Sequence, residues 1–220
     1  MLERFLAIFH TLEYEEFGWV ELLAADFQGK GCGLEFLVST GIEDEPAQRW
    51  AVHCLERLDY RLSGSTAHSH YHLELHQAPH LLLAPYTEPR AQLYFWGRPR
   101  DPARTAVALH ECSRGLVDRF PLATVAGLNG SIGLDRFLEF GTGIVAEGPV
   151  PVLTRYAEVL RAEGLETNIL PTINPNLRSR DEVGVLVLGD SYVVGTHFDA
   201  LLLSSESAGG EAGEAQARGR

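Results

Sequence analysis

The chain has 220 residues, and its hydrophobic content of 45% and charged content of 22% are ordinary for a folded globular protein. Its formal net charge is −12, and Lys30 is its single lysine. Nucleic acids and anionic membranes bind clustered Lys and Arg, so this charge argues against both as the main partner. A protein partner with a basic or neutral surface is compatible with it.

The cysteines and the first residues indicate the compartment. Cys32, Cys54 and Cys112 are widely spaced and form no CxxC pair, which predicts neither a disulfide framework nor a thiolate zinc site. Residues 1–10 lack the basic start and long apolar stretch of a signal peptide, and no apolar run approaches the length of a membrane span. We therefore expect a soluble, cytoplasmic protein.

The first hundred residues predict a helix followed by antiparallel strands. Apolar side chains recur at helical spacing over residues 2–12, and the period then changes to two. Alternating or apolar segments separated by turn residues predict the strands, at residues 17–27, 32–40, 49–62, 68–76, 81–86 and 92–96. These segments predict an antiparallel sheet of about six strands, curled or arranged in two layers.

The second half predicts two helices and a closing β-hairpin. Asp101-Pro102 is typical of a helix start, and this helix is expected to run toward Phe120. A second helix is expected from Pro149 or Pro151 to Gly164, and the glycine-rich residues 127–148 between the helices are expected to form loops. The hairpin is predicted from two apolar runs around turn residues, at residues 183–188, 189–191 and 192–195.

These elements predict a single α+β domain over residues 1–203. Its first part, residues 1–100, is β-rich, and residues 101–203 mix helices with the hairpin. From residue 204 onward Ser, Gly, Ala and Glu dominate, and such a composition offers nothing to bury. We expect residues 204–220 to be a disordered tail.

Residues 68–76 read His-Ser-His-Tyr-His-Leu-Glu-Leu-His and carry the strongest chemical signal in the chain. In a β-strand the period of two places every second residue on one face. We call the polar set on that face the histidine stripe: His68, His70, His72, Glu74 and His76. Imidazole and carboxylate groups are common ligands of transition metals, so the stripe is a candidate metal site.

Pairing the stripe with the preceding strand reduces the number of candidate ligands. If residues 49–62 and 68–76 form an antiparallel hairpin, the polar sets and the apolar sets fall into register together. That register pairs Arg61 with His68, Asp59 with His70, Arg57 with His72, Leu55 with Glu74 and His53 with His76. His68 and His72 then face arginines, whose charge disfavours a bound cation.

The candidate metal ligands that remain are His53, Glu74 and His76, with His70 and Asp59 in reserve. Two imidazoles and a carboxylate form the set that many open metal sites use, with a divalent transition metal such as Zn. Two alternatives stay open. The stripe could be a solvated polar sheet face without a ligand, as antiparallel sheets commonly have. It could also sense pH, because several histidines would gain charge on mild acidification.

The sequence contains no complete catalytic set. Together with the acidic charge, this favours a non-enzymatic protein-binding module that recognises another protein, of the adaptor, inhibitor or immunity kind, and that needs no cofactor. The alternative is a metal-dependent enzyme, a hydrolase, that uses the cluster on the sheet face. Tyr94, Phe95 and Trp96 alternate across a predicted strand, so we expect at least one of these rings to be exposed, as suits a protein interface.

Overall fold

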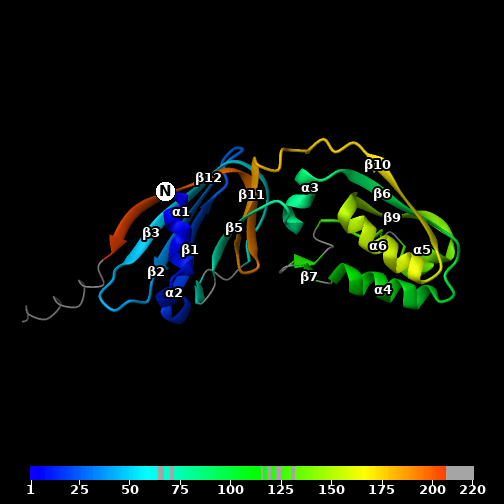
Figure 1. The fold of residues 1–220 in the computed structure, drawn as a ribbon, viewed down its shortest axis with the longest axis horizontal. Helices are drawn as coiled ribbons and strands as arrows, with labels where there is room; N and C mark the ends of the chain where they lie inside the picture. The colour runs from blue at the N-terminus through cyan, green and yellow to red at the C-terminus, as the bar shows by residue number, and fades with distance from the viewer. Residues whose placement is uncertain are drawn as a thin grey trace, which may run out of the picture. The chain divides into compact units, whose positions relative to one another are not determined.

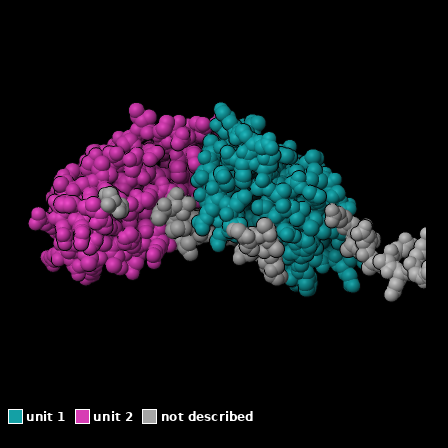
Figure 2. Space-filling view, turned by 180° about the vertical axis from the view of Figure 1, so that it is seen from behind, with its two compact units in different colours: residues 1–75, 186–220 teal, residues 76–185 magenta. Residues whose placement is uncertain are grey.

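The structure, a computed structural model, describes residues 1–63, 67–69, 72–114, 116–117, 120–121, 125–129 and 132–206 (Figure 1). The chain divides into two compact units, shown in different colours in Figure 2. Unit 1 comprises residues 1–75 and 186–220, and unit 2 comprises residues 76–185. The predicted α+β class is confirmed, while the single domain over residues 1–203 stays a prediction.

A seven-stranded sheet, which we call the main sheet, has the strand order β4-β1-β2-β3-β12-β11-β5. The strands β1 to β4 and β12 pair antiparallel with their neighbours in this group. The strands of the main sheet are β1 (Trp19–Asp26), β2 (Cys32–Ser39), β3 (Ala47–Arg61), β4 (Ala67–Ser69), β5 (Leu73–Gln77), β11 (Val183–Leu188) and β12 (Ser191–Glu206).

Short N-terminal helices cover part of this sheet within unit 1. They are α1 (Leu2–Ala7), the 3-10 helix η1 (Ile8–His10) and α2 (Leu12–Phe17). Thr11 caps α2, because its hydroxyl accepts a hydrogen bond from the Tyr14 N–H at 3.3 Å. Phe5, Phe9 and Tyr14 are fully buried, and the Phe5 ring lies 4.9 Å from the Trp50 ring of β3. The apolar periodicity of residues 2–12 therefore provides the core of unit 1.

Unit 2 contains a three-stranded antiparallel sheet of order β10-β6-β9. The helix α6 packs on all three strands, α4 packs on α5 and α6, and Figure 1 shows these helices grouped together. The remaining elements of the unit are short. In chain order the elements of unit 2 are η2 (Leu81–Leu83), α3 (Ala84–Thr87), β6 (Arg90–Trp96), α4 (Pro102–Arg114), β7 (Leu116–Val117), β8 (Phe120–Pro121), α5 (Leu134–Glu139), β9 (Thr142–Pro149), α6 (Val150–Ala162) and β10 (Glu166–Thr172).

Several predicted elements are confirmed. The strand pair around residues 28–31 is β1 and β2, and both predicted helices are present as α4 and α6. However, α4 ends at Arg114 and does not run toward Phe120, which begins β8. Asp101 caps α4 by accepting a hydrogen bond from the Arg104 N–H at 3.0 Å. Gly164 follows α6 with φ +83, a left-handed conformation that few other residues adopt readily. The closing hairpin is formed by the adjacent strands β11 and β12.

Other predictions of local structure were wrong. Residues 81–86, expected as a strand, form η2 and α3, because Pro85 suits a first helical turn and His80 Nδ1 accepts a hydrogen bond from the Leu82 N–H. The stretch 127–148, expected as loops, contains α5 and most of β9. The tail was expected from residue 204, but β12 continues to Glu206 in pairing with β3. Residues 207–220 lie outside the described residues.

Candidate functional site

The histidine stripe is not a single strand, and it does not pair with the strand that precedes it. Those of its residues that lie in strands are divided between β4 and β5, which stand at opposite ends of the strand order of the main sheet. The neighbours of β3 are β2 and β12, and the strands β12 and β11 lie between β3 and β5 in the main sheet. With neighbouring strands about 4.8 Å apart, β3 and β5 are separated by roughly 14 Å along the sheet. The predicted hairpin between residues 49–62 and 68–76 is therefore wrong, and it does not bring His53 beside Glu74 and His76.

The described residues of the stripe have other surroundings. Glu74 and His76 are half-buried on β5, and the rings of His76 and His80 stack with centroids 4.8 Å apart. His72, expected opposite an arginine, instead has its Nδ1 atom 2.7 Å from the Phe9 carbonyl oxygen. The backbone of His68 pairs with Val20 of β1. The side chain of His68, and all of His70, lie outside the described residues.

The reserve ligand Asp59 is already engaged by two donors. Its Oδ2 atom accepts a hydrogen bond from the Tyr192 hydroxyl at 3.2 Å, and its Oδ1 atom accepts one from the Tyr60 N–H at 2.8 Å. Burial, together with the negative charge of Asp59, raises the pKa of Tyr192 to about 12. The neutral phenol therefore stays available as a donor, and Asp59 has a structural role between β3 and β12.

Among the residues that the structure describes, no group of three or more His, Cys, Asp or Glu side chains is arranged to hold a metal ion. We expect elemental analysis of the protein, purified without a histidine tag, to find no stoichiometric Zn, Fe or Mn. The reason is that the ligands proposed from the sequence lie on separated strands. Stoichiometric metal in the wild type that is lost in His76→Ala would contradict this expectation.

His53 instead lines an open cleft of about 560 Å³ in unit 1. In the register of the main sheet His53 lies opposite Asp199 of β12 and opposite Gly33 of β2. A Cβ atom on Gly33 would lie 3.5 Å from His53 Nδ1, so the ring lies over the glycine. His197 also lines the cleft, with φ +51, a strained conformation for a residue other than glycine. The sequence did not indicate this grouping, because β12 joins β3 from the far end of the chain.

The clearest surface feature of unit 2 is the face of its three-stranded sheet that lies away from α6. Ala91, Leu93 and Phe95 of β6 are fully buried, and Phe95 packs edge-on against Phe137 of α5. The alternate residues of β6 therefore point to the other face. Directly opposite residues share a face, so we define the open face by Arg90, Gln92, Tyr94 and Trp96 of β6, Glu147 of β9 and Leu170 of β10.

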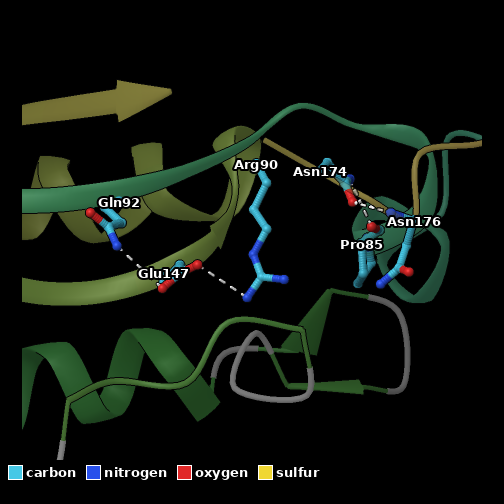
Figure 3. A network of polar contacts seen from close by, with 6 residues as sticks. All are labelled: Pro85, Arg90, Gln92, Glu147, Asn174 and Asn176. Carbon is cyan, nitrogen blue, oxygen red and sulfur yellow. Dashed lines mark hydrogen bonds and ion pairs between the residues drawn. The ribbon is translucent and has the colours of Figure 1, made fainter. Parts of the chain in front are cut away.

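Polar contacts connect the side chains of the open face into a continuous row. Glu147 forms an ion pair with Arg90 at 3.3 Å and accepts a hydrogen bond from Gln92 at 3.4 Å (Figure 3). Tyr94 donates its hydroxyl proton to Gln92 Oε1 at 3.0 Å, and its ring stacks on Trp96 with centroids 6.1 Å apart and planes 18° apart. Because each side chain is held by a neighbour, the row is preorganised for binding.

Trp96 and Leu170 supply the apolar area of this face. Trp96 is 41% exposed and Leu170 is 42% exposed, although both belong to strands of the sheet. The expectation that one ring of the Tyr94–Trp96 group is exposed is confirmed. An exposed tryptophan supported by a stacked tyrosine is the side chain type that contributes most often to binding energy at protein interfaces.

A small cavity of about 110 Å³ lies at the Arg90 end of the open face. Asn174 and Glu88 line this cavity. The Asn174 amide donates to the Pro85 carbonyl oxygen at 3.0 Å (Figure 3) and to the Glu88 carbonyl oxygen, also at 3.0 Å. The Glu88 carboxylate is paired with Arg180 at 2.6 Å. Arg90 Nε is buried and has no hydrogen-bond partner among the described residues.

No protein-family model, no curated protein and no solved structure matches this chain. Within the described part of the chain, no helix combines the length and the apolar composition that a membrane span requires.

Proposed function

We propose that the chain is a non-enzymatic protein-binding module, of the adaptor, inhibitor or immunity kind, and that the open face of unit 2 contacts the partner. The observation that carries the proposal is the exposed Trp96, held by Tyr94 in a row of paired polar side chains. A surface of this kind can bury aromatic area with a small loss of side-chain entropy, since the rotamers are already restricted.

The chemistry of the face defines the partner. The whole chain carries a formal charge of −12, but within residues 76–185 eleven arginines nearly balance twelve Asp and Glu residues. On the open face itself, Arg90 shares its charge with Glu147. The face is therefore close to neutral, and it lacks the clustered basic side chains that a nucleic acid needs. Trp96 and Leu170 favour a folded protein that presents an apolar side chain to this face.

Site-specific photo-crosslinking tests the proposal. The crosslinking amino acid benzoylphenylalanine replaces Leu170 on the open face, and in a matched control it replaces Val107, which is 55% exposed on α4. We expect the first protein to crosslink in cells to a defined protein and the control to give no such product. The purified partner should then bind the unmodified chain directly.

Two outcomes would contradict the proposal. One is a crosslink that forms equally well from Val107, which would place the contact outside the open face. The other is a partner whose purified form binds wild type and Trp96→Ala with the same affinity. The metal-dependent hydrolase suggested by the histidine stripe is the alternative function, and the elemental analysis described above tests it independently.

A further inference from the structure

A pair of cysteines in unit 1 forms a second site that is independent of the open face. Cys32 of β2 and Cys54 of β3 are directly opposite in the antiparallel register, and both thiols are free and buried. Their side chains are hydrogen-bonded to each other. Both residues border the open cleft that contains His53, while their side chains lie on the opposite, core face of the sheet. A small oxidant such as hydrogen peroxide therefore reaches the thiols through local opening at this end of the strands.

The geometry of the strands suits a bond between the two sulfur atoms. Directly opposite residues in antiparallel strands have Cα atoms about 4.5–5.5 Å apart, which lies within the range of about 4.4–6.8 Å found for disulfides. Gly195 of β12 leaves the space that the Cys54 thiol occupies. A Cβ atom on Gly195 would overlap Cys54 Sγ and would lie 2.6 Å from the Glu56 carbonyl oxygen.

The surroundings also distinguish the two thiols. The hydrogen bond from Cys54 lowers the pKa of Cys32, and the nearby charge of Arg57 acts in the same direction. Arg57 is held in place, because its guanidinium lies 5.1 Å from the centroids of both the Phe27 and Tyr60 rings and donates to the Phe27 carbonyl oxygen. The same hydrogen bond and burial raise the pKa of Cys54. Although burial opposes the lowering of the Cys32 pKa, the net effect makes Cys32 the more readily ionised thiol of the pair.

We propose that Cys32 and Cys54 form a peroxide-reactive pair that converts reversibly to a disulfide joining β2 and β3. The oxidant is hydrogen peroxide. The Cys32 thiolate attacks one peroxide oxygen, the O–O bond breaks, and the leaving hydroxide takes a proton to become water. The sulfur of Cys54 then attacks the sulfenic acid on Cys32, the S–O bond breaks, and hydroxide leaves with the Cys54 proton as a second water. Two thiols and one peroxide thus give one disulfide and two waters.

Peptide mapping of the full chain tests the proposal. The reduced protein is treated with one equivalent of hydrogen peroxide, alkylated and digested without reductant. We expect a peptide linked through Cys32 and Cys54, and reductant should restore both thiols. Cys112 on α4 is the matched comparison within the same molecule, since burial raises its pKa. Cys32 should react faster than Cys112, because the pKa of Cys32 is lowered and that of Cys112 is raised.

Single substitutions separate the two roles. Cys54→Ser should accumulate sulfenic acid on Cys32, which dimedone traps, and Cys112→Ser should form the Cys32–Cys54 bond as the wild type does. Oxidation of Cys112 while Cys32 and Cys54 remain thiols would overturn the proposal. So would full alkylation of all three cysteines after peroxide, or linkage only between different molecules. The wild type and Cys112→Ser decide the question even if the other variant folds poorly.

Discussion

Replacing Trp50 by Ala is expected to lower the free energy of unfolding by about 3–5 kcal/mol, the range measured for large-to-small substitutions of buried aromatic residues. Trp50 lies near the start of β3 and is 1% exposed, and its ring packs on Phe5 of α1. Its indole N–H donates to Gln48 Oε1 at 3.0 Å, so the polar atom of the ring is satisfied. The substitution would leave a cavity between the N-terminal helix and the main sheet.

Trp96→Ala is the matched control for this measurement, because it removes the same side chain from an exposed position. We expect Trp96→Ala to change the free energy of unfolding by about 0.5 kcal/mol or less, as is usual for surface substitutions. Urea denaturation followed by far-ultraviolet circular dichroism measures both variants without relying on tryptophan fluorescence. Equal destabilisation by the two substitutions would show that the assignment of Trp50 to the core is wrong.

The same Trp96→Ala substitution is expected to weaken binding of the crosslinked partner by about 2 kcal/mol or more, which is about a 30-fold rise in Kd. Affinity is expected to fall for two reasons. The substitution removes the apolar area of the indole, and it removes the last side chain of the preorganised row that begins at Arg90. Isothermal titration calorimetry with the purified partner measures it directly. Because the substitution should leave stability almost unchanged, reduced binding could not be attributed to unfolding.

Phe140→Ala provides the control for the binding measurement. Phe140 follows α5 in the same unit and is 64% exposed, so it offers comparable apolar area outside the open face. We expect its Kd to remain within about threefold of the wild-type value, as for residues outside a hot spot. A loss of affinity in Phe140→Ala with an unchanged Trp96→Ala would place the interface elsewhere on unit 2.

Local signals in the sequence were sufficient to predict where the two longer helices of unit 2 begin or end. Asp101-Pro102 identified the start of α4, and Gly164 identified the end of α6, because caps act within one helical turn. The alternation of Tyr94, Phe95 and Trp96 also predicted that at least one of these rings is exposed, but not which one. The apolar run at residues 81–86 could not be assigned in this way, since a short run rich in leucine suits a helix as well as a strand.

The sequence could not predict which strands are neighbours, because sequence-distant segments determine that order. The metal cluster of His53, Glu74 and His76 assumed that consecutive strands pair, which holds for roughly two-thirds of cases. Here β12 returns from the C-terminal part of the chain and pairs with β3 along its length. The same strand brings His197 and Asp199 to the cleft and places Gly195 against Cys54. The residues of the cleft, and likewise Gly195 and Cys54, come from strands that are far apart in the sequence. No local spacing of residues could therefore predict these contacts.

Side-chain footprinting of the complex tests the central claim most directly. Hydroxyl radicals oxidise exposed aromatic residues, and mass spectrometry measures the extent at each position with and without the purified partner. The proposed interface predicts that the partner protects Trp96 and Tyr94 from oxidation while Phe140 reacts as in the free protein. Unchanged oxidation of Trp96 in a complex that has formed would contradict the claim that the open face binds the partner.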